Sequence, residues 1–319
     1  MAGYAFKFPS PDGGGQGGSC TLPAGMRRAV SLLSFLVLAG CGSRAATTST
    51  SATQNPTVES LASPTASPAA GKSNQDAVLG PAGMTLQQEI GAVMMVGFTG
   101  PPTLAILEDW RQHQFGGLIV VPLNQNGGDA AAIRQLIQSV RGVMRRPLMA
   151  ATNPEEGAAH SEPVRTSREL KALGFDINLA PVAGAHDVTA AIADIHAAGM
   201  YAVAQDSTDF RAVIAAHVEF VVVGHLQLPS IAVPNDLGYQ GVIISDDLQS
   251  TALSPQNAPA AAVRFLKNGG DMVIVAHDIA VADATYAAIH AAVLSGSYPR
   301  AQLDGSVQKL LSLGLRYMP

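Results

Sequence analysis

Residues 241–248 read Gly-Val-Ile-Ile-Ser-Asp-Asp-Leu, an apolar run that follows a glycine and ends in two adjacent acids. A run that is apolar almost throughout is typical of a strand buried on both faces of a parallel sheet. Seven further runs of this kind, bounded by Gly or Pro, occur at 92–98, 116–122, 147–152, 176–181, 201–205, 219–225 and 272–277. Helical periodicity lies between most of them, as at 130–145 and 258–268, and continues after the last run at 283–294 and in a closing helix at 306–315. Eight strands alternating with helices predict a TIM-type (β/α)8 barrel of the α/β class.

The spacing of these runs is uneven. The run at 201 starts 18 residues before the run at 219, which in turn starts 22 residues before the run at 241. A βα unit needs roughly 20 or more residues, so these units have almost no loop to spare. Because catalytic residues of such barrels lie on the loops after the strands, reduced βα loops predict a reduced active site.

The N-terminal region matches the pattern of a secretion signal. Residues 26–28 read Met-Arg-Arg and precede an apolar run, 29–38, that is too short to span a bilayer. The sequence Leu-Ala-Gly-Cys at 38–41 resembles the bacterial lipobox, whose cysteine is acylated and becomes the new N-terminus. We expect residues 1–41 to be a signal segment, in which 1–25 are an extended n-region or reflect an upstream start. Cys41 is then the lipidation site, on the outer face of the membrane in a bacterial cell envelope.

Residues 42–84 form a predicted linker. Ser, Thr, Pro and Ala make up 26 of its 43 residues, and it contains no aromatic residue. Such a segment cannot bury enough apolar surface to offset its conformational entropy. We expect a disordered stalk that joins the anchor to a folded domain at 85–319.

The composition of the chain excludes several classes of protein. Its 319 residues carry a formal net charge of −5, and 47% of them are hydrophobic, enough for a sizeable core. Two cysteines exclude a disulfide scaffold, and mild acidity without Lys/Arg blocks argues against a nucleic-acid partner. The histidines, His113 among them, show no metal-ligand spacing, so we expect no metal and no cofactor.

The two acids at the end of the 241–248 run are the strongest candidates for chemistry. A carboxylate at the C-terminal rim of a barrel can attack an anomeric carbon, as a retaining glycosidase requires. Alternatively, Asp247 caps a following helix and Asp246 accepts N–H bonds of the loop.

This segment resembles the nucleophile motif of glycoside hydrolase family 3, β-N-acetylhexosaminidase type. The resemblance continues in order along 85–319, through segments similar to the family's first, second, fourth, sixth and eighth strands: 86–98, 115–119, 170–182, 221–225 and 268–272. It implies a barrel in a shortened form that acts on O-glycosidic bonds.

The resemblance also implies roles for particular residues. Asp246 falls on the catalytic nucleophile, which forms a covalent glycosyl-enzyme, and His225 falls on a position that lines the sugar site. Asn153 and Glu155 lie in the segment Asn-Pro-Glu-Glu-Gly, where the family has Asp-Gln-Glu-Gly-Gly. We therefore expect Asn153, Glu155 and His225 to bind substrate.

One departure from the family is severe. Members follow the fifth strand with a Lys-His-Phe-Pro-Gly-His-Gly loop, which supplies sugar-binding groups and a histidine general acid/base. Here Gln205 and Asp206 stand at its first two positions, and the remainder is absent. Asp206 is the candidate substitute for the acid/base, a role that typically contributes 10²–10⁴-fold in rate.

Two functions remain open. The first is a cell-surface lipoprotein that hydrolyses N-acetylglucosamine-containing cell-wall glycans by a retaining mechanism through Asp246. The second is a catalytically inactive barrel that binds glycan or protein in the envelope. We expect a monomer with glycan or peptidoglycan fragments as partners, and contact with the membrane through the lipid anchor only.

Overall fold

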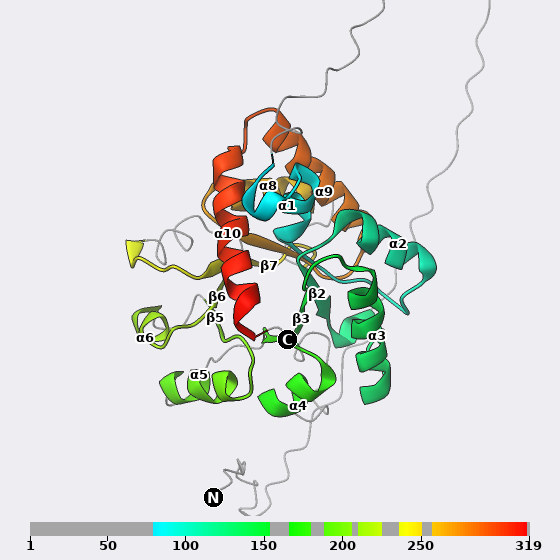
Figure 1. Ribbon diagram of the computed structural model, residues 1–319, viewed down its shortest axis with the longest axis vertical. Coiled ribbons are helices and arrows are strands. Elements are labelled where there is room, and N and C mark those ends of the chain that lie inside the picture. Colours follow the sequence, from blue (N-terminus) through cyan, green and yellow to red (C-terminus); the bar gives the residue numbers. More distant parts are fainter. Residues whose placement is uncertain are drawn as a thin grey trace, which may run out of the picture. The chain divides into compact units, whose positions relative to one another are not determined.

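The computed structural model describes residues 79–153, 166–179, 188–205, 210–224, 236–250 and 257–317. Eight parallel strands form a single sheet in the order β4-β3-β2-β1-β8-β7-β6-β5, curled into a nearly closed barrel with helices around it (Figure 1). The strands are β1 (Met94–Val96), β2 (Gly117–Val120), β3 (Met149–Thr152), β4 (Ile177–Asn178), β5 (Val203–Gln205), β6 (Phe220–Val223), β7 (Val242–Asp247) and β8 (Met272–Val275). The predicted TIM-type barrel is confirmed, and all eight apolar runs contain an observed strand.

Most helices of the described residues lie outside this ring, and the last of them, α10, also extends across one end of it. The helices are α1 (Leu86–Ala92), α2 (Leu104–His113), α3 (Ala130–Val143), α4 (Ser167–Leu173), α5 (Val188–Ala197), α6 (Phe210–Ala215), α8 (Ala258–Lys267), α9 (Ile279–Leu294) and α10 (Arg300–Tyr317), with short 3₁₀ turns η2 (Pro81–Gly83) and η3 (Pro122–Asn124). In the described part of the chain, none of them is long and apolar enough to cross a membrane.

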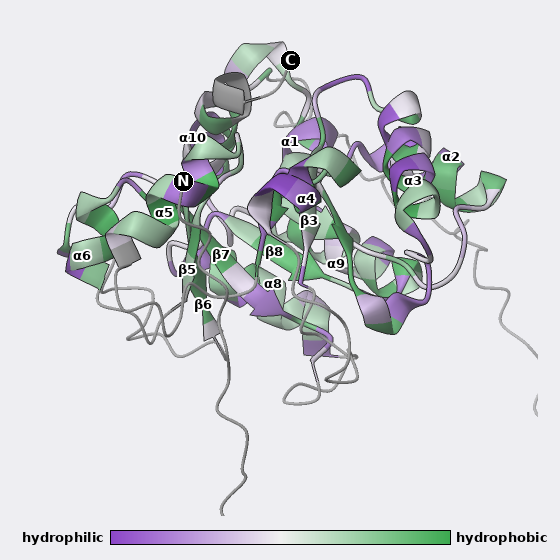
Figure 2. Ribbon diagram, turned by 90° about the horizontal axis from the view of Figure 1, so that it is seen from below, coloured by the Kyte–Doolittle hydropathy of each residue, from purple (hydrophilic) through white to green (hydrophobic). Residues whose placement is uncertain are grey.

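Helix α3 illustrates how the sequence sets these elements. The Asp129 carboxylate accepts the backbone N–H groups of the first turn, which otherwise have no partner within the helix. Leu136, Ile137 and Val140 recur at helical spacing and are buried in the hydrophobic core. In Figure 2 the apolar colour extends along β5 and β6, where Val203, Ala204 and residues 220–223 are buried.

The barrel closes between β4 and β5, its two end strands. A single parallel bridge joins Ile177 of β4 to Tyr201, just before β5, and the Tyr201 N–H donates to the Asp176 carbonyl at 2.8 Å. Strand β5 ends at Gln205 and α6 begins at Phe210, so residues 206–209 are the whole connection. The shortened fifth unit therefore keeps its place in the ring, and the prediction of reduced loops holds at this position.

The N-terminal ends of the strands form the barrel floor. A buried acid precedes each of β4, β6 and β8, and its carboxylate accepts the backbone N–H of the neighbouring strand: Asp176 from Ala150, Glu219 from Ala202 and Asp271 from Ile243. Basic side chains of the helices pair with these acids: Arg141 and Lys171, His196, and Lys309, respectively. The floor is thus polar, but its charges are paired and hydrogen-bonded, as burial requires.

Strand β2 departs from this pattern for a steric reason. Gly116 precedes it, and a Cβ at Gly116 would lie 2.0 Å from the Ala92 carbonyl oxygen. Any side chain there is excluded, and the Gly116 N–H instead donates to backbone carbonyls of Gly91 and Met94.

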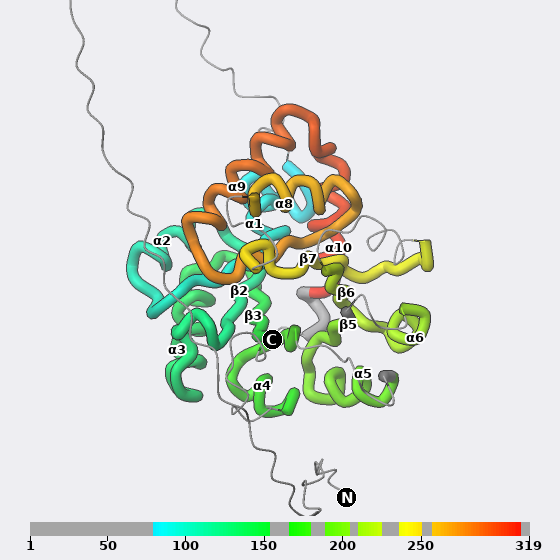
Figure 3. Tube along the Cα trace, turned by 180° about the vertical axis from the view of Figure 1, so that it is seen from behind, coloured from blue at the N-terminus to red at the C-terminus, as the bar shows by residue number. Residues whose placement is uncertain are grey.

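Helix α10 packs against the floor. The Tyr201 hydroxyl donates to the Leu313 carbonyl of α10 at 2.7 Å, and Lys309 of the same helix reaches Asp271 at 2.8 Å. Figures 1 and 3 show α10, drawn in red, running inward from the outer helices and ending near the middle of the strand ring. The opposite end of the barrel, where the strands terminate, is the mouth.

Candidate active site

The mouth collects the residues that follow each strand, because all strands are parallel. Asp246 lies at the C-terminal end of β7, and Asn153 directly follows β3. In the ring, β3 and β7 are four strands apart, so these two residues lie on opposite sides of the mouth. The other predicted site residues, Cys41, Glu155, Asp206 and His225, lie outside the described residues.

A β-bulge changes the direction of the side chains at the end of β7. Ile244 pairs with Met272 of β8, but the next pair joins Asp247 to Ile274, so one extra residue is inserted in β7. The Ser245 hydroxyl fills the gap in the ladder, because it accepts the Ile274 N–H at 2.9 Å. Bulges of this kind commonly turn a side chain toward an active site.

The structure separates the two adjacent acids. Asp247 is buried, and its Oδ1 accepts the N–H groups of Ala276 at 3.0 Å and of Gln249 at 3.1 Å. Its carboxylate therefore joins the ends of β7 and β8 and the turn after β7. Asp246 is only partly buried, and its Oδ1 accepts the N–H of Asp247 at 2.8 Å. Of the two acids, Asp246 is therefore the one whose carboxylate is both accessible to solvent and held in position by a hydrogen bond.

A polar network that the sequence did not reveal holds the mouth on this side. Asn124, at the end of η3, donates from Nδ2 to the Ala276 carbonyl at 2.7 Å, which fixes its amide so that Oδ1 faces His277 Nδ1 at 2.7 Å. His277 Nε2 lies 3.3 Å from Asp247 Oδ2. Gln249 Oε1 accepts the backbone N–H groups of His277 and Asp278.

This network excludes His277 as a replacement acid/base. Both of its ring nitrogens face protein groups, Nδ1 toward Asn124 and Nε2 toward Asp247. A general acid must present a nitrogen to the leaving group. Asn124 and His277 are 153 positions apart, so no local spacing in the sequence could have indicated their contact.

Asn153 is suited to binding a polar ligand. Its Oδ1 is shielded from solvent and has no hydrogen-bond partner among the described residues. An unpaired buried acceptor is costly, so a donor such as a sugar hydroxyl would be stabilised there. Asn153 lacks the charge of the family's aspartate, which would strengthen such a bond.

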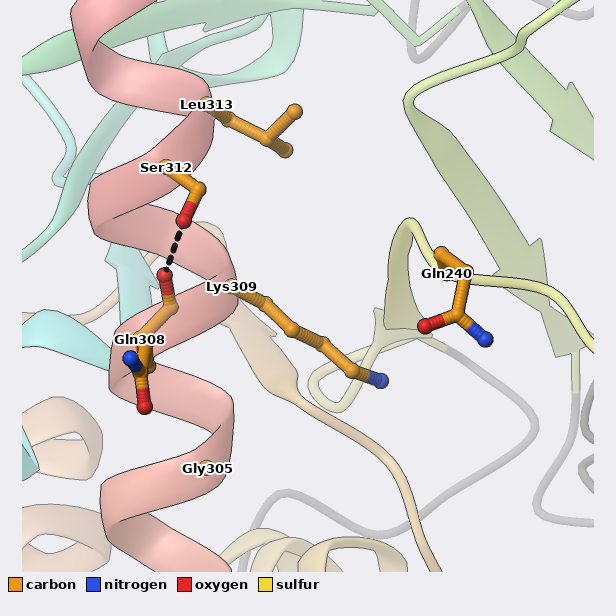
Figure 4. A pocket seen from close by; sticks show the side chains of 6 residues that line it. All are labelled: Gln240, Gly305, Gln308, Lys309, Ser312 and Leu313. Carbon is orange, nitrogen blue, oxygen red and sulfur yellow. Dashed lines mark hydrogen bonds between the residues drawn. The ribbon is translucent and has the colours of Figure 1, made fainter.

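One cavity lined by described residues lies at the other end of the barrel. It has a volume of about 300 Å³ between α10 and the segment before β7, and Gln240 and Lys309 face each other across it (Figure 4). Its remaining walls are Gly305, Gln308, Ser312 and Leu313 of α10. Since Lys309 pairs with Asp271 on the floor, this cavity is remote from Asp246.

Comparison with known proteins shows which proteins this chain resembles. No protein-family model matches the chain. A β-hexosaminidase of Stenotrophomonas maltophilia (strain R551-3) is 23% identical over 290 residues, which covers 61% of this chain and 86% of that protein. The structure of a glycoside hydrolase family 3 β-N-acetylglucosaminidase from Paenibacillus superposes with a TM-score of 0.62 at 22% identity. The chain resembles the N-terminal barrel of glycoside hydrolase family 3.

The matched part makes up different shares of the related proteins. The superposition on the Paenibacillus protein covers 73% of this chain and 63% of that protein, so this chain spans less than two thirds of its length. A β-N-acetylhexosaminidase from Beutenbergia cavernae has a TM-score of 0.55 at 20% identity, with 72% of this chain and 98% of that one covered. The resemblance inferred from the 241–248 motif is therefore borne out.

Proposed function

We propose that this protein is a retaining glycoside hydrolase that cleaves N-acetylglucosamine-containing cell-wall glycans, with Asp246 as nucleophile. The observation that carries the proposal is the position of Asp246: a partly exposed carboxylate on a bulge at the C-terminal end of β7, next to a second acid that is committed to structure. Two relatives named as hexosaminidases and one named as a β-N-acetylglucosaminidase support the substrate class.

In the proposed reaction a carboxylate oxygen of Asp246 attacks the anomeric carbon while the glycosidic bond breaks. The leaving oxygen takes a proton from a general acid, for which Asp206 is the proposed residue. Water then attacks the glycosyl-enzyme, its proton returns to the same group, and the Asp246 carboxylate is released. Asn153 binds a sugar hydroxyl through its Oδ1, which has no partner among the residues that the structure describes.

A second function is favoured by one observation. Only residues 206–209 connect β5 to α6, so the family's acid/base loop has no counterpart of its length. In this alternative the barrel binds a glycan or a protein without turning it over.

The experiment compares the full chain with Asp246→Asn on a chromogenic β-N-acetylglucosaminide. A fluorinated N-acetylglucosaminide, which traps the glycosyl-enzyme, is followed by intact-mass measurement. We expect turnover and an adduct of one sugar in the parent, both lost in Asp246→Asn and kept in Glu108→Gln, an exposed acid on α2. Equal background from all three proteins and no adduct overturn the proposal, and measurable glycan binding would then identify the second function.

We further propose that the protein is a lipoprotein of the cell envelope, anchored through Cys41. The lipobox-like residues 38–41 support this, and residues 42–84 provide the tether. Cys41→Ser should move the protein from the membrane fraction to the soluble fraction. Unchanged partitioning of Cys41→Ser contradicts the anchor but leaves the hydrolase proposal untouched.

A further inference from the structure

A cluster of potential metal ligands lies outside the barrel wall, between α2 and α9. These helices follow β1 and β8, which are neighbours in the sheet, and Figures 1 and 3 both show them side by side. Asp109 and His113 are four residues apart on α2 and so share one face of that helix. Asp283 reaches the same place from α9. The cluster is on the flank of the barrel and is distinct from the mouth that holds Asp246.

The distances within the cluster suit a small divalent cation. His113 Nδ1 lies 2.8 Å from Asp109 Oδ1 and 3.8 Å from Asp283 Oδ1, and one ligand atom from each side chain falls within 4.8 Å of the others. With metal–ligand bonds of about 2.0–2.2 Å, neighbouring ligand atoms are about 3–3.5 Å apart. Small side-chain rotations would therefore bring all three atoms onto one ion.

Three polar atoms of the cluster are shielded from solvent and have only one another as polar neighbours in the described part of the chain. They are Asp109 Oδ2, His113 Nδ1 and Asp283 Oδ1. His113 Nδ1 lies within ion-pair distance of the Asp109 carboxylate, and the neighbouring Asp109 raises the pKa of His113 against the effect of burial. Shielded polar atoms normally find partners, and an ion bound between these three atoms would supply one.

The ring of His113 is held in place by its aromatic neighbours. It stacks on Phe115 with centroids 5.2 Å apart, and the Tyr286 ring lies edge-on at 4.5 Å. The Tyr286 hydroxyl donates to the Gln87 carbonyl, which fixes that ring in turn. A ligand whose orientation is set by packing loses little freedom on binding a metal.

The accessibility of the three side chains provides an entry path. His113 is 14% exposed and Asp109 is 18% exposed, whereas Asp283 is 47% exposed. The ion would be enclosed on the α2 side and open to water on the Asp283 side, where solvent completes its coordination.

We propose that Asp109, His113 and Asp283 form a site for a divalent transition-metal ion that joins α2 to α9. One imidazole nitrogen and two carboxylates suit Zn²⁺ or Mn²⁺, whereas Mg²⁺ and Ca²⁺ prefer oxygen ligands throughout. No local pattern in the sequence indicates this site, because two of its ligands lie on one helix and the third is 170 residues away. It departs from our sequence-based expectation that the protein binds no metal.

The test uses the full chain, stripped with a chelator and titrated with Zn²⁺ by calorimetry. We expect one ion per chain and a rise in the melting temperature. His113→Gln and Asp283→Asn should each weaken binding roughly tenfold or more. Glu108→Gln, on the same helix but outside the cluster, should bind as the parent does. Since Asp283 is half exposed, Asp283→Asn is expected to fold even where His113→Gln does not.

Cobalt substitution gives an independent readout. Co²⁺ bound at this site should show visible absorption bands that are lost in Asp283→Asn and retained in Asp246→Asn, which separates this proposal from the hydrolase proposal. Zn²⁺ binding that is equal in the parent and in both ligand variants overturns the site. The absence of any Zn²⁺ binding at millimolar concentration also overturns it, and the cluster is then an ion pair of His113 with its two acids.

Discussion

At the scale of single residues, Asp246 and Asp247 have the same side chain but different surroundings, and these surroundings determine what each carboxylate can contact. Consecutive residues of a strand point in different directions, and the bulge places Asp247 toward β8, where two backbone N–H groups need an acceptor. Asp246 then faces away from that interface. Their chemistry is equal, so their surroundings decide which one is available to a substrate.

The two acids should therefore differ in their effect on stability. Asp247→Ala leaves the N–H groups of Ala276 and Gln249 without their acceptor, and we expect the free energy of unfolding to fall by about 2–4 kcal/mol. Asp246→Ala should change it by less than about 1 kcal/mol. Urea denaturation of the two variants measures the difference, and equal losses would contradict this assignment.

The buried carboxyl of Glu89 should make the stability of the protein depend on pH. It is fully buried on α1 beside Arg300, and burial, opposed by Arg300, raises its pKa from 4.5 to about 7. Between these values the carboxyl is protonated in the folded state and ionised in the unfolded state, so this group's contribution to stability falls as the pH rises from about 4.5 to about 7.

We expect Glu89→Gln to remove that fall. The measurement is the free energy of unfolding at pH 5 and at pH 8, compared between the parent and the variant, with Glu108→Gln as the control for an exposed acid. The parent should lose more stability than Glu89→Gln between the two pH values. An identical change in both proteins would show that Glu89 does not ionise in this range.

At the scale of elements, the floor acids explain how a strand start can be both buried and polar. Asp271 satisfies the Ile243 N–H, the Ser306 hydroxyl and the Lys309 ammonium at once. The same arrangement recurs at Asp176 and Glu219, which tie a strand to its neighbour and to an outer helix. Each acid thus connects three elements that hydrophobic packing alone would leave free to shift.

Asp271→Ala should accordingly be strongly destabilising. It leaves Lys309 without its acid and Ile243 without its acceptor, and breaking a buried pair typically costs about 3–5 kcal/mol. Ser306→Ala removes only one neutral donor and should cost about 1 kcal/mol. Thermal or chemical denaturation orders the two variants, and a milder effect for Asp271→Ala would refute the role of the floor acids.

The strands were predictable from the sequence, whereas the mouth was not. Runs such as 241–246 and 272–277 are largely apolar because both of their faces are buried, and such a run can be recognised from consecutive residues alone. The contact of Asn124 with His277 depends on the ring bringing β2 and β8 to the same edge, which no local pattern encodes. Asp246 could be proposed from the sequence because a motif of adjacent residues marks it.

At the scale of the whole molecule, neighbouring strands of the barrel share different numbers of backbone pairs. Strands β8 and β1 pair over three residues, but β4 and β5 share the single bridge between Ile177 and Tyr201. Local opening follows the weakest set of contacts, so this junction should open before the rest.

Hydrogen exchange tests this difference on two matched amides. Tyr201 and Val273 are both buried, and their N–H groups donate to carbonyls at 2.8 Å and 2.9 Å. We expect the Tyr201 amide to exchange about tenfold faster or more, because fewer neighbouring pairs protect it. Comparable protection of the two amides would mean that the ring opens as one unit.

The single bridge between β4 and β5 also bears on how the chain could be rewired. A circular permutant would join the present ends of the folded domain and start between β4 and α5. The cut would then fall between the two strands that share the fewest backbone pairs. The floor acids and the β8–β1 pairing would stay within continuous chain. The barrel is, in that sense, a strip of eight strands with a natural beginning at β5 and a natural end at β4.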